Sequence, residues 1–278
     1  MLVEMFLKTA MAPAVVVGIL VLLFGSAPEP WRSRMQGLIV AAGFVVSSYL
    51  LSGAPVWPPE GGAGSLAWVA LWFGLFSWVA APGTYAKTLF RGTWIIVGVI
   101  LVVYKLHHAI LNSPVQARNV LALVCAGWGM WGALERGLRV SKPLTVVSMG
   151  MVTFTAASVL FLLESSLLMS QLMTSLAVIS GGLAVMAWLF SKRLSLHAVL
   201  PFMSGFIGVV MVLGYVFMDI SPWRMLALAI PFAALFVKDL FKLTSSSALT
   251  DAIVTIVLAA LPLGYILWKI SLTSGPLY

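Results

Sequence analysis

The pattern of apolar and polar positions divides the chain into long apolar runs separated by short polar or basic segments. The most informative run covers residues 143–190 and contains a single charged side chain, Glu164. One membrane crossing takes about 20 apolar residues, so this run has the length of two crossings with Glu164 in the turn between them. Basic residues stand just outside both ends. This predicts a transmembrane hairpin with its ends in the cytoplasm and its turn outside.

The same unit repeats before and after this hairpin and predicts ten membrane-spanning helices. The fourth helix has a purely apolar part that begins near Thr93 and stops at Val103, which is too short to span, so we expect it to continue to Leu111. No segment alternates with the two-residue period of a β-barrel strand. The chain is therefore predicted to be an all-α integral membrane protein with a single transmembrane domain over residues 1–278. The expected helices are 5–24, 35–51, 65–81, 93–111, 119–134, the two helices of the hairpin, 197–218, 225–237 and 252–270.

The positions of the basic residues predict the orientation of these helices. Basic residues concentrate in cytoplasmic loops, so both termini and the loop at 53–64 are predicted on the non-cytoplasmic side, and we expect the plasma (inner) membrane of a bacterium. Five helices before the loop at 136–142 and five after it would make the halves 1–135 and 143–278 inverted, an arrangement that many transporters use. With the N-terminus outside, the predicted inner loops hold most of the 16 lysines and arginines: Arg32, Arg34, Lys87, Arg91, Arg136, Arg139, Lys142, Lys192, Arg193, Lys238 and Lys242.

Composition excludes an ordinary soluble domain. The chain is 62% hydrophobic and 9% charged, whereas soluble domains carry about 25% charged residues. The formal net charge of +8 would suit nucleic acid, but the basic residues lie in short clusters between apolar runs. The expected partner is therefore the lipid bilayer with its anionic headgroups, and no nucleic acid. The single cysteine, Cys125, lies in an apolar run and is expected to be a small buried residue without a disulfide.

Residues 127–132 match the GxGxxG pattern of dinucleotide-binding loops. That function needs a strand before the motif, and here the motif lies inside a predicted helix. We instead expect these glycines to let another helix approach closely, and we interpret the glycines at 181–182, Gly205 and Gly208 in the same way. Trp128 and Trp131 are expected to fill space or to lie near the inner interface.

Lys105, His107 and His108 form the most informative polar group, because ionisable side chains at membrane depth often mark functional sites. One interpretation is interfacial, with the lysine reaching the headgroups and Glu164 solvated in its turn. The other is a cavity open to the outer side, lined by these three residues and Glu164. His197 is predicted about 30 Å away at the inner side, and adjacent histidines on a helix point about 100° apart. No haem or other cofactor is therefore expected within this chain.

The sequence lacks the residue sets that intramembrane chemistry would need. It contains no Ser/His/Asp set, no HExxH motif, no P-loop and no metal-ligand cluster, so we predict no catalytic or metal-binding residues and no enzyme activity. Lys238 and Asp239 are predicted to form a pair at the membrane interface.

Two function classes stay open. The first is a transporter or permease for an apolar, aromatic or lipid-like substrate. It is favoured by the number of helices and by Pro13, Pro231 and Pro262, which lie inside predicted helices and would loosen the backbone around a site. The second is a non-catalytic accessory subunit of a larger membrane complex, which short loops and many large apolar side chains would suit. The sequence identifies neither a substrate nor a partner subunit.

Overall fold

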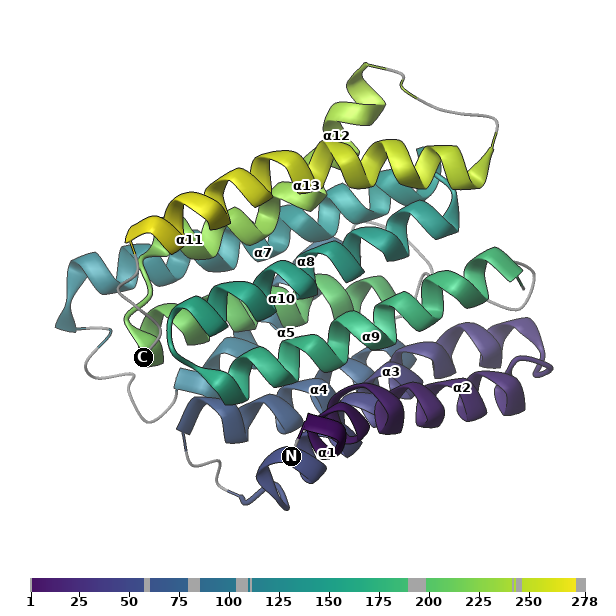
Figure 1. Ribbon diagram of the computed structural model, residues 1–278, viewed down its shortest axis with the longest axis horizontal. Coiled ribbons are helices and arrows are strands. Elements are labelled where there is room, and N and C mark those ends of the chain that lie inside the picture. Colours follow the sequence, from purple (N-terminus) through teal and green to yellow (C-terminus); the bar gives the residue numbers. More distant parts are fainter. Residues whose placement is uncertain are drawn as a thin grey trace.

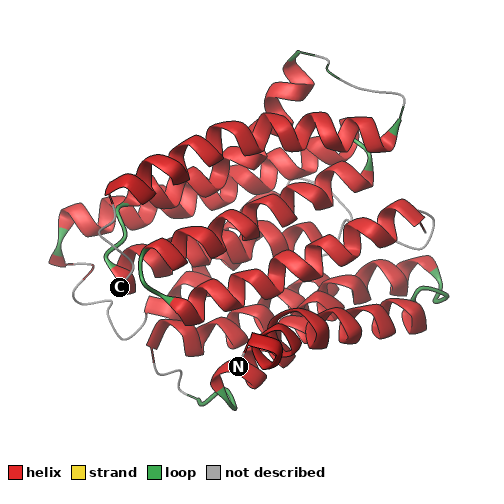
Figure 2. Cartoon of the chain, in the orientation of Figure 1, coloured by secondary structure: helices red, strands yellow, loops and turns green. Residues whose placement is uncertain are grey.

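The computed structural model describes residues 2–57, 61–79, 86–103, 110, 112–189, 199–241, 243 and 247–273. Every regular element in this part of the chain is a helix, and the helices run side by side in one bundle (Figures 1 and 2). The all-α class predicted from the sequence is confirmed.

The described helices follow one another as ten segments, two of which are interrupted. They are α1 (Leu2–Phe6), the π-helix η1 (Leu7–Met11) and α2 (Ala12–Phe24); α3 (Glu29–Ser52); α4 (Gly61–Val79); α5 (Ala86–Val103); α7 (Pro114–Val140); α8 (Pro143–Leu163); α9 (Leu167–Leu189); α10 (Val199–Met218); α11 (Pro222–Leu226), the 3-10 turn η5 (Ala227–Ala229) and α12 (Ile230–Leu240); and α13 (Ala248–Thr273).

Within the described residues, five helices are long and apolar enough to cross a membrane. The apolar stretches of α4, α5 and α10 are shorter. The qualifying five include both arms of the hairpin predicted at 143–190. They are Val3–Phe24, Arg34–Ser52, Pro143–Leu163, Leu167–Leu189 and Ala248–Thr273.

The hairpin of α8 and α9 turns tightly at Glu164, as its sequence predicts. Ser165 has a left-handed backbone with φ of 61°. The Ser166 N–H donates to the Phe161 carbonyl at 2.8 Å, and the Ser165 N–H donates to the Leu162 carbonyl at 3.0 Å. These two bonds are those of a Schellman motif, which satisfies the last carbonyls of a helix and ends it.

Helices α5 and α7 extend past their predicted ends into sequence that carries basic residues. Helix α5 begins at Ala86 and not near Thr93, so its 18 described residues already reach Val103. The predicted start near Thr93 is therefore wrong, and α5 reaches the length of a crossing without the residues up to Leu111. Helix α7 likewise continues to Val140, through residues assigned to a loop. The reason is physical, because a helix satisfies its own backbone beyond the apolar core while long basic side chains extend toward water.

Helix α10 forms the centre of the bundle. Every residue from 202 to 214 is buried, and α10 packs against α3, α4, α5 and α7. The ring of Phe206 lies 5.0 Å from that of Phe44, 5.4 Å from that of Phe202 and 6.5 Å from that of Phe154. Helix α10 of the second half thus shares its core with helices of the first half.

Glycines allow α7 and α10 to approach each other closely in the core. A Cβ atom at Gly127 of α7 would lie 3.0 Å from the Cα of Gly208 on α10, and one at Gly205 would overlap the ring of Phe73. The predicted close approach is confirmed at these glycines. It is wrong at Gly129, where a Cβ would meet nothing within 4 Å, and likewise at the other two open positions, Gly132 and Gly182.

The remaining side chains of this part of α7 divide between core and surface. Trp131 is buried beside Phe76, with ring centroids 5.7 Å apart. Trp128 is exposed at the surface of the bundle. Cys125 is also exposed, so the expectation that it is buried is wrong. Apolar character did not separate core from surface here, because a bundle in lipid presents apolar residues on both.

Replacing Gly127 by alanine should destabilise the bundle, because its methyl group would press on the Gly208 backbone. We expect a loss of about 1–3 kcal/mol, as for other overpacked cores. Gly129→Ala is the matched control on the same helix, and it should be neutral or gain about 0.5–1 kcal/mol of helix propensity. Thermal unfolding in mild detergent measures both variants. Equal effects would contradict the contact between α7 and α10.

Candidate functional site

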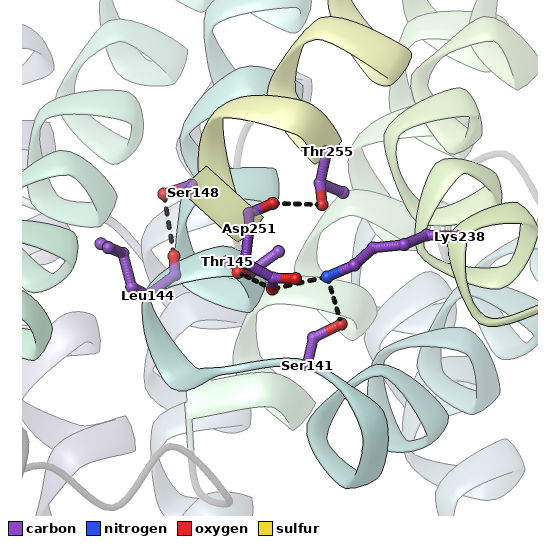
Figure 3. A network of polar contacts seen from close by, with 7 residues as sticks. All are labelled: Ser141, Leu144, Thr145, Ser148, Lys238, Asp251 and Thr255. Atoms are coloured by element: carbon purple, nitrogen blue, oxygen red, sulfur yellow. Dashed lines mark hydrogen bonds and ion pairs between the residues drawn. The ribbon is translucent and has the colours of Figure 1, made fainter. Parts of the chain in front are cut away.

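Two charged side chains are buried together at one end of the bundle (Figure 3). Lys238 lies in the last turn of α12 and Asp251 in the first turn of α13. Their side chains are 1% and 2% exposed, and Lys238 Nζ lies 2.5 Å from Asp251 Oδ2. We call these two residues the buried pair. Ionisable side chains this deep in an apolar bundle are expensive unless paired, which makes them candidates for function.

Two hydroxyl groups from the junction of α7 and α8 complete the buried pair. Thr145 in the first turn of α8 donates to Asp251 Oδ2 at 2.6 Å. Lys238 Nζ donates to Ser141 Oγ at 3.0 Å. Lys238 and Thr145 approach the Asp251 carboxylate from opposite sides (Figure 3). The arrangement therefore ties α12, α13 and the junction together through one carboxylate.

The local sequence explains why these groups meet. Ser141 and Lys142 are extended, and Pro143 at the first position of α8 starts the helix with Thr145 facing Asp251. The Thr255 hydroxyl donates to the Asp251 carbonyl at 2.7 Å within α13. The two charges also suit their helix ends, because a carboxylate is favoured in the first turn and an ammonium in the last.

The structure corrects the predicted partner of Lys238. The sequence pointed to its neighbour Asp239 in an interfacial pair, but Lys238 is buried and paired with Asp251 across the connection from α12 to α13. The side chain of Asp239 lies outside the described residues. A signal was available in the sequence, because Asp251 begins a long apolar helix and would need a buried partner.

Glu164 forms a second ion pair at the other end of α8. Arg224 on α11 donates through Nη1 to Glu164 Oε1. The two side chains are 33% and 20% exposed, respectively. We call them the turn pair, since Glu164 caps α8 and Arg224 follows the turn that ends α10. Glu164 is thus held by a cation from another helix, which the sequence analysis did not identify.

The predicted outer cavity lies mostly outside the described residues. Lys105, His107 and His108 belong to the undescribed stretch 104–109, as His197 belongs to 190–198. Of the four residues expected to line the cavity, the structure describes Glu164 alone. The cavity stays a prediction.

Pro13 coincides with the first interruption of helical geometry. The Ala12 N–H donates to the Leu7 carbonyl, one residue further back than in an α-helix. The next amide position is Pro13, which has no N–H, so the Lys8 carbonyl lacks its amide partner. The Ser47 hydroxyl donates to that carbonyl at 3.2 Å, and Ser47 Oγ lies 2.6 Å from Ser175 Oγ. Neighbouring helices thereby satisfy the freed backbone group, as a membrane requires.

Pro231 coincides with the second interruption. It has no N–H for the Ala227 carbonyl four residues earlier, and the Ile230 N–H donates to that carbonyl instead, which makes the 3-10 turn η5. Of the three prolines expected to loosen the backbone, Pro13 and Pro231 coincide with interruptions of α-helical geometry. Pro262 differs, because α13 continues through it as one α-helix.

Comparisons of this chain with models of known protein families, with curated proteins and with solved structures find no match.

Removing one member of the buried pair should destabilise the protein strongly. Lys238→Met or Asp251→Asn alone leaves the partner without its counter-charge, which costs about 3–5 kcal/mol in known buried pairs. The double variant removes both charges and should lose clearly less than the sum of the single losses. Thermal unfolding in mild detergent gives the three values.

Lys8→Met is the control for that cycle. Lys8 pairs with Glu4 at 2.8 Å on the surface, where both side chains are well exposed, and such pairs contribute little. Its unfolding temperature should match that of the unchanged protein. Additive losses at Lys238 and Asp251 would show that the two charges do not act as a pair.

Proposed function

We propose that this chain is a transporter or permease of the bacterial inner membrane for an apolar, aromatic or lipid-like substrate. One observation carries the proposal: the interrupted helix formed by α11, η5 and α12 ends in the buried pair. Transporters commonly build their sites from discontinuous helices, and an ionisable pair inside an apolar bundle is a functional candidate by default. A static scaffold would need neither feature.

The proposed topology is ten crossings with the buried pair at the cytoplasmic end. The turns from α2 to α3 and from α7 to α8 lie at the same end of the bundle as the start of α13, and the turn from α8 to α9 lies at the other end (Figure 1). Helix α5 has 18 described residues, about 27 Å at about 1.5 Å per residue, close to the hydrocarbon thickness of about 30 Å. Helix α10, whose apolar stretch is also short, needs less apolar length because other helices surround it.

The proposed substrate class is supported by the apolar character of the bundle interior. Its core consists mainly of aliphatic, methionine and phenylalanine side chains, with serine and threonine as the main polar groups. A site that opens within such an interior would favour an apolar or aromatic molecule with few charges. The charged residues of the buried pair are already engaged with each other, so they act in the conformational cycle rather than on the substrate.

A second candidate is an accessory subunit of a membrane complex. It is favoured by the outer face of α13, where Leu261, Tyr265 and Trp268 are each at least 60% exposed. These residues follow the spacing of one helix face. The face fits lipid tails equally well, so we rank this function second.

Ligand-dependent thermal stabilisation tests the proposal. The purified chain is screened in mild detergent against apolar, aromatic and lipid-like compounds, with unfolding temperature as the readout. A transported compound should raise it, because a ligand at 100 times its dissociation constant contributes about 2.7 kcal/mol. Purification with a second membrane protein at fixed stoichiometry, and no stabilisation by any compound, would favour the accessory subunit instead.

A further inference from the structure

The two ion pairs hold the two ends of the same interrupted helix. Arg224 of the turn pair lies in α11, before η5, and Lys238 of the buried pair lies near the end of α12, after η5. Along α8, Thr145 contacts the buried pair and Glu164 belongs to the turn pair. These two positions are about 28 Å apart at about 1.5 Å per residue, roughly the thickness of the hydrocarbon core. Each pair therefore lies near one boundary of the proposed membrane.

The segment between the two pairs is where this helix can bend. The 3-10 turn η5 has poorer hydrogen-bond geometry than an α-helix, and such turns inside a helix often mark hinges. Pro231 follows it and removes one backbone bond. Ala227 and Leu228 of η5 are buried, and η5 contacts α7, α8 and α13. A bend at η5 would move α11 and α12 relative to each other within a fixed frame of helices.

Ion pairs suit gates because they are stable in two states. When the gate is closed the charges are paired, and when water enters the charges are hydrated separately. An apolar contact at the same place would be stable only in the closed state. The turn pair is partly exposed, whereas the buried pair is almost inaccessible and has two further hydroxyl partners. The turn pair is consequently the easier of the two to open.

We propose that the turn pair is the outer gate and the buried pair the inner gate of an alternating-access cycle, with α11, η5 and α12 as the moving element. This proposal rests on the proposed transport function. In this structure both ion pairs are formed, so both proposed gates are in their closed state. Weakening one gate should favour the state open at that end, and alternating access then requires the opposite end to close more tightly.

Cysteine accessibility measures both ends at once. Two buried positions serve as reporters in a chain whose native cysteine is removed by Cys125→Ser. Met225→Cys reports on the end with the turn pair, since Met225 lies beside Arg224 and packs near Gly214. Ser148→Cys reports on the other end, one turn after Thr145 and also buried. The probe is a charged, water-soluble thiol reagent, and the rate of labelling in mild detergent is the readout.

Glu164→Gln should raise the labelling rate at Met225→Cys by about tenfold or more and lower the rate at Ser148→Cys. Asp251→Asn should do the reverse. The decisive value is the change at the remote reporter, because Ser148 lies about 24 Å from Glu164 along α8 at about 1.5 Å per residue. Glu164→Gln gives that value even if Asp251→Asn fails to fold, because the turn pair is partly exposed and its loss is mild. Lys8→Met, which removes a surface pair, should change neither rate.

Three outcomes would overturn the gate proposal. If the labelling rate changes only at the substituted end, each pair stabilises its own end and does not control the other. An increase at both ends together means that the bundle loosens, and no change at either end means that the pairs do not control access. These readouts need no ligand, so they are independent of the thermal screen. Ligand stabilisation without reciprocal labelling would leave the transport function standing and remove these gates.

Discussion

Polar groups buried in an apolar bundle must find partners within the protein, and this constraint governs the structure more than any other. Water is absent from the core of a membrane, so an unsatisfied carbonyl or an unpaired charge there is costly. The Lys8 carbonyl, freed by the π-helix and Pro13, is reached by Ser47 from α3. The Asp251 carboxylate is reached by Lys238 and Thr145 from two other helices. In each case a polar group that its own helix leaves unsatisfied finds its partner on another helix.

The same constraint links stability to motion. The buried pair joins the ends of several helices, and such a pair adds little net stability relative to apolar side chains, because desolvation offsets much of the attraction. Its value to a transporter is that water can take over both charges when the end opens. The interrupted helix with ion pairs near both ends combines a hinge with two reversible contacts. This combination is our reason for preferring a moving protein over a scaffold.

Much of the fold could be predicted from the sequence, because apolar run length and turn residues are local signals. The hairpin with its turn at Glu164 was predicted correctly, and so was the close approach at Gly127 and Gly208. Helix ends were predicted less well. Helix α5 starts at Ala86 since a helix can continue into charged sequence, and hydropathy does not record this.

The candidate site could not be predicted in the same way. Thr145 and Asp251 are 106 residues apart in sequence, and no local pattern indicates which helix faces which. The exposure of Cys125 could not be predicted either, because an apolar residue in a membrane helix can face either the lipid or the core. The sequence analysis singled out Glu164 but predicted neither its ion pair nor its partner Arg224.

Sidedness in the membrane is the central claim of this account and can be measured directly. Single cysteines are placed at Ala54, in the exposed loop between α3 and α4, and at Ser26, in the exposed turn between α2 and α3, both with Cys125→Ser. Intact cells are treated with a membrane-impermeant thiol reagent. We predict labelling at Ala54→Cys and none at Ser26→Cys until the cells are opened. The reverse pattern, or equal labelling at both positions in intact cells, would contradict the proposed topology and with it the assignment of inner and outer gates.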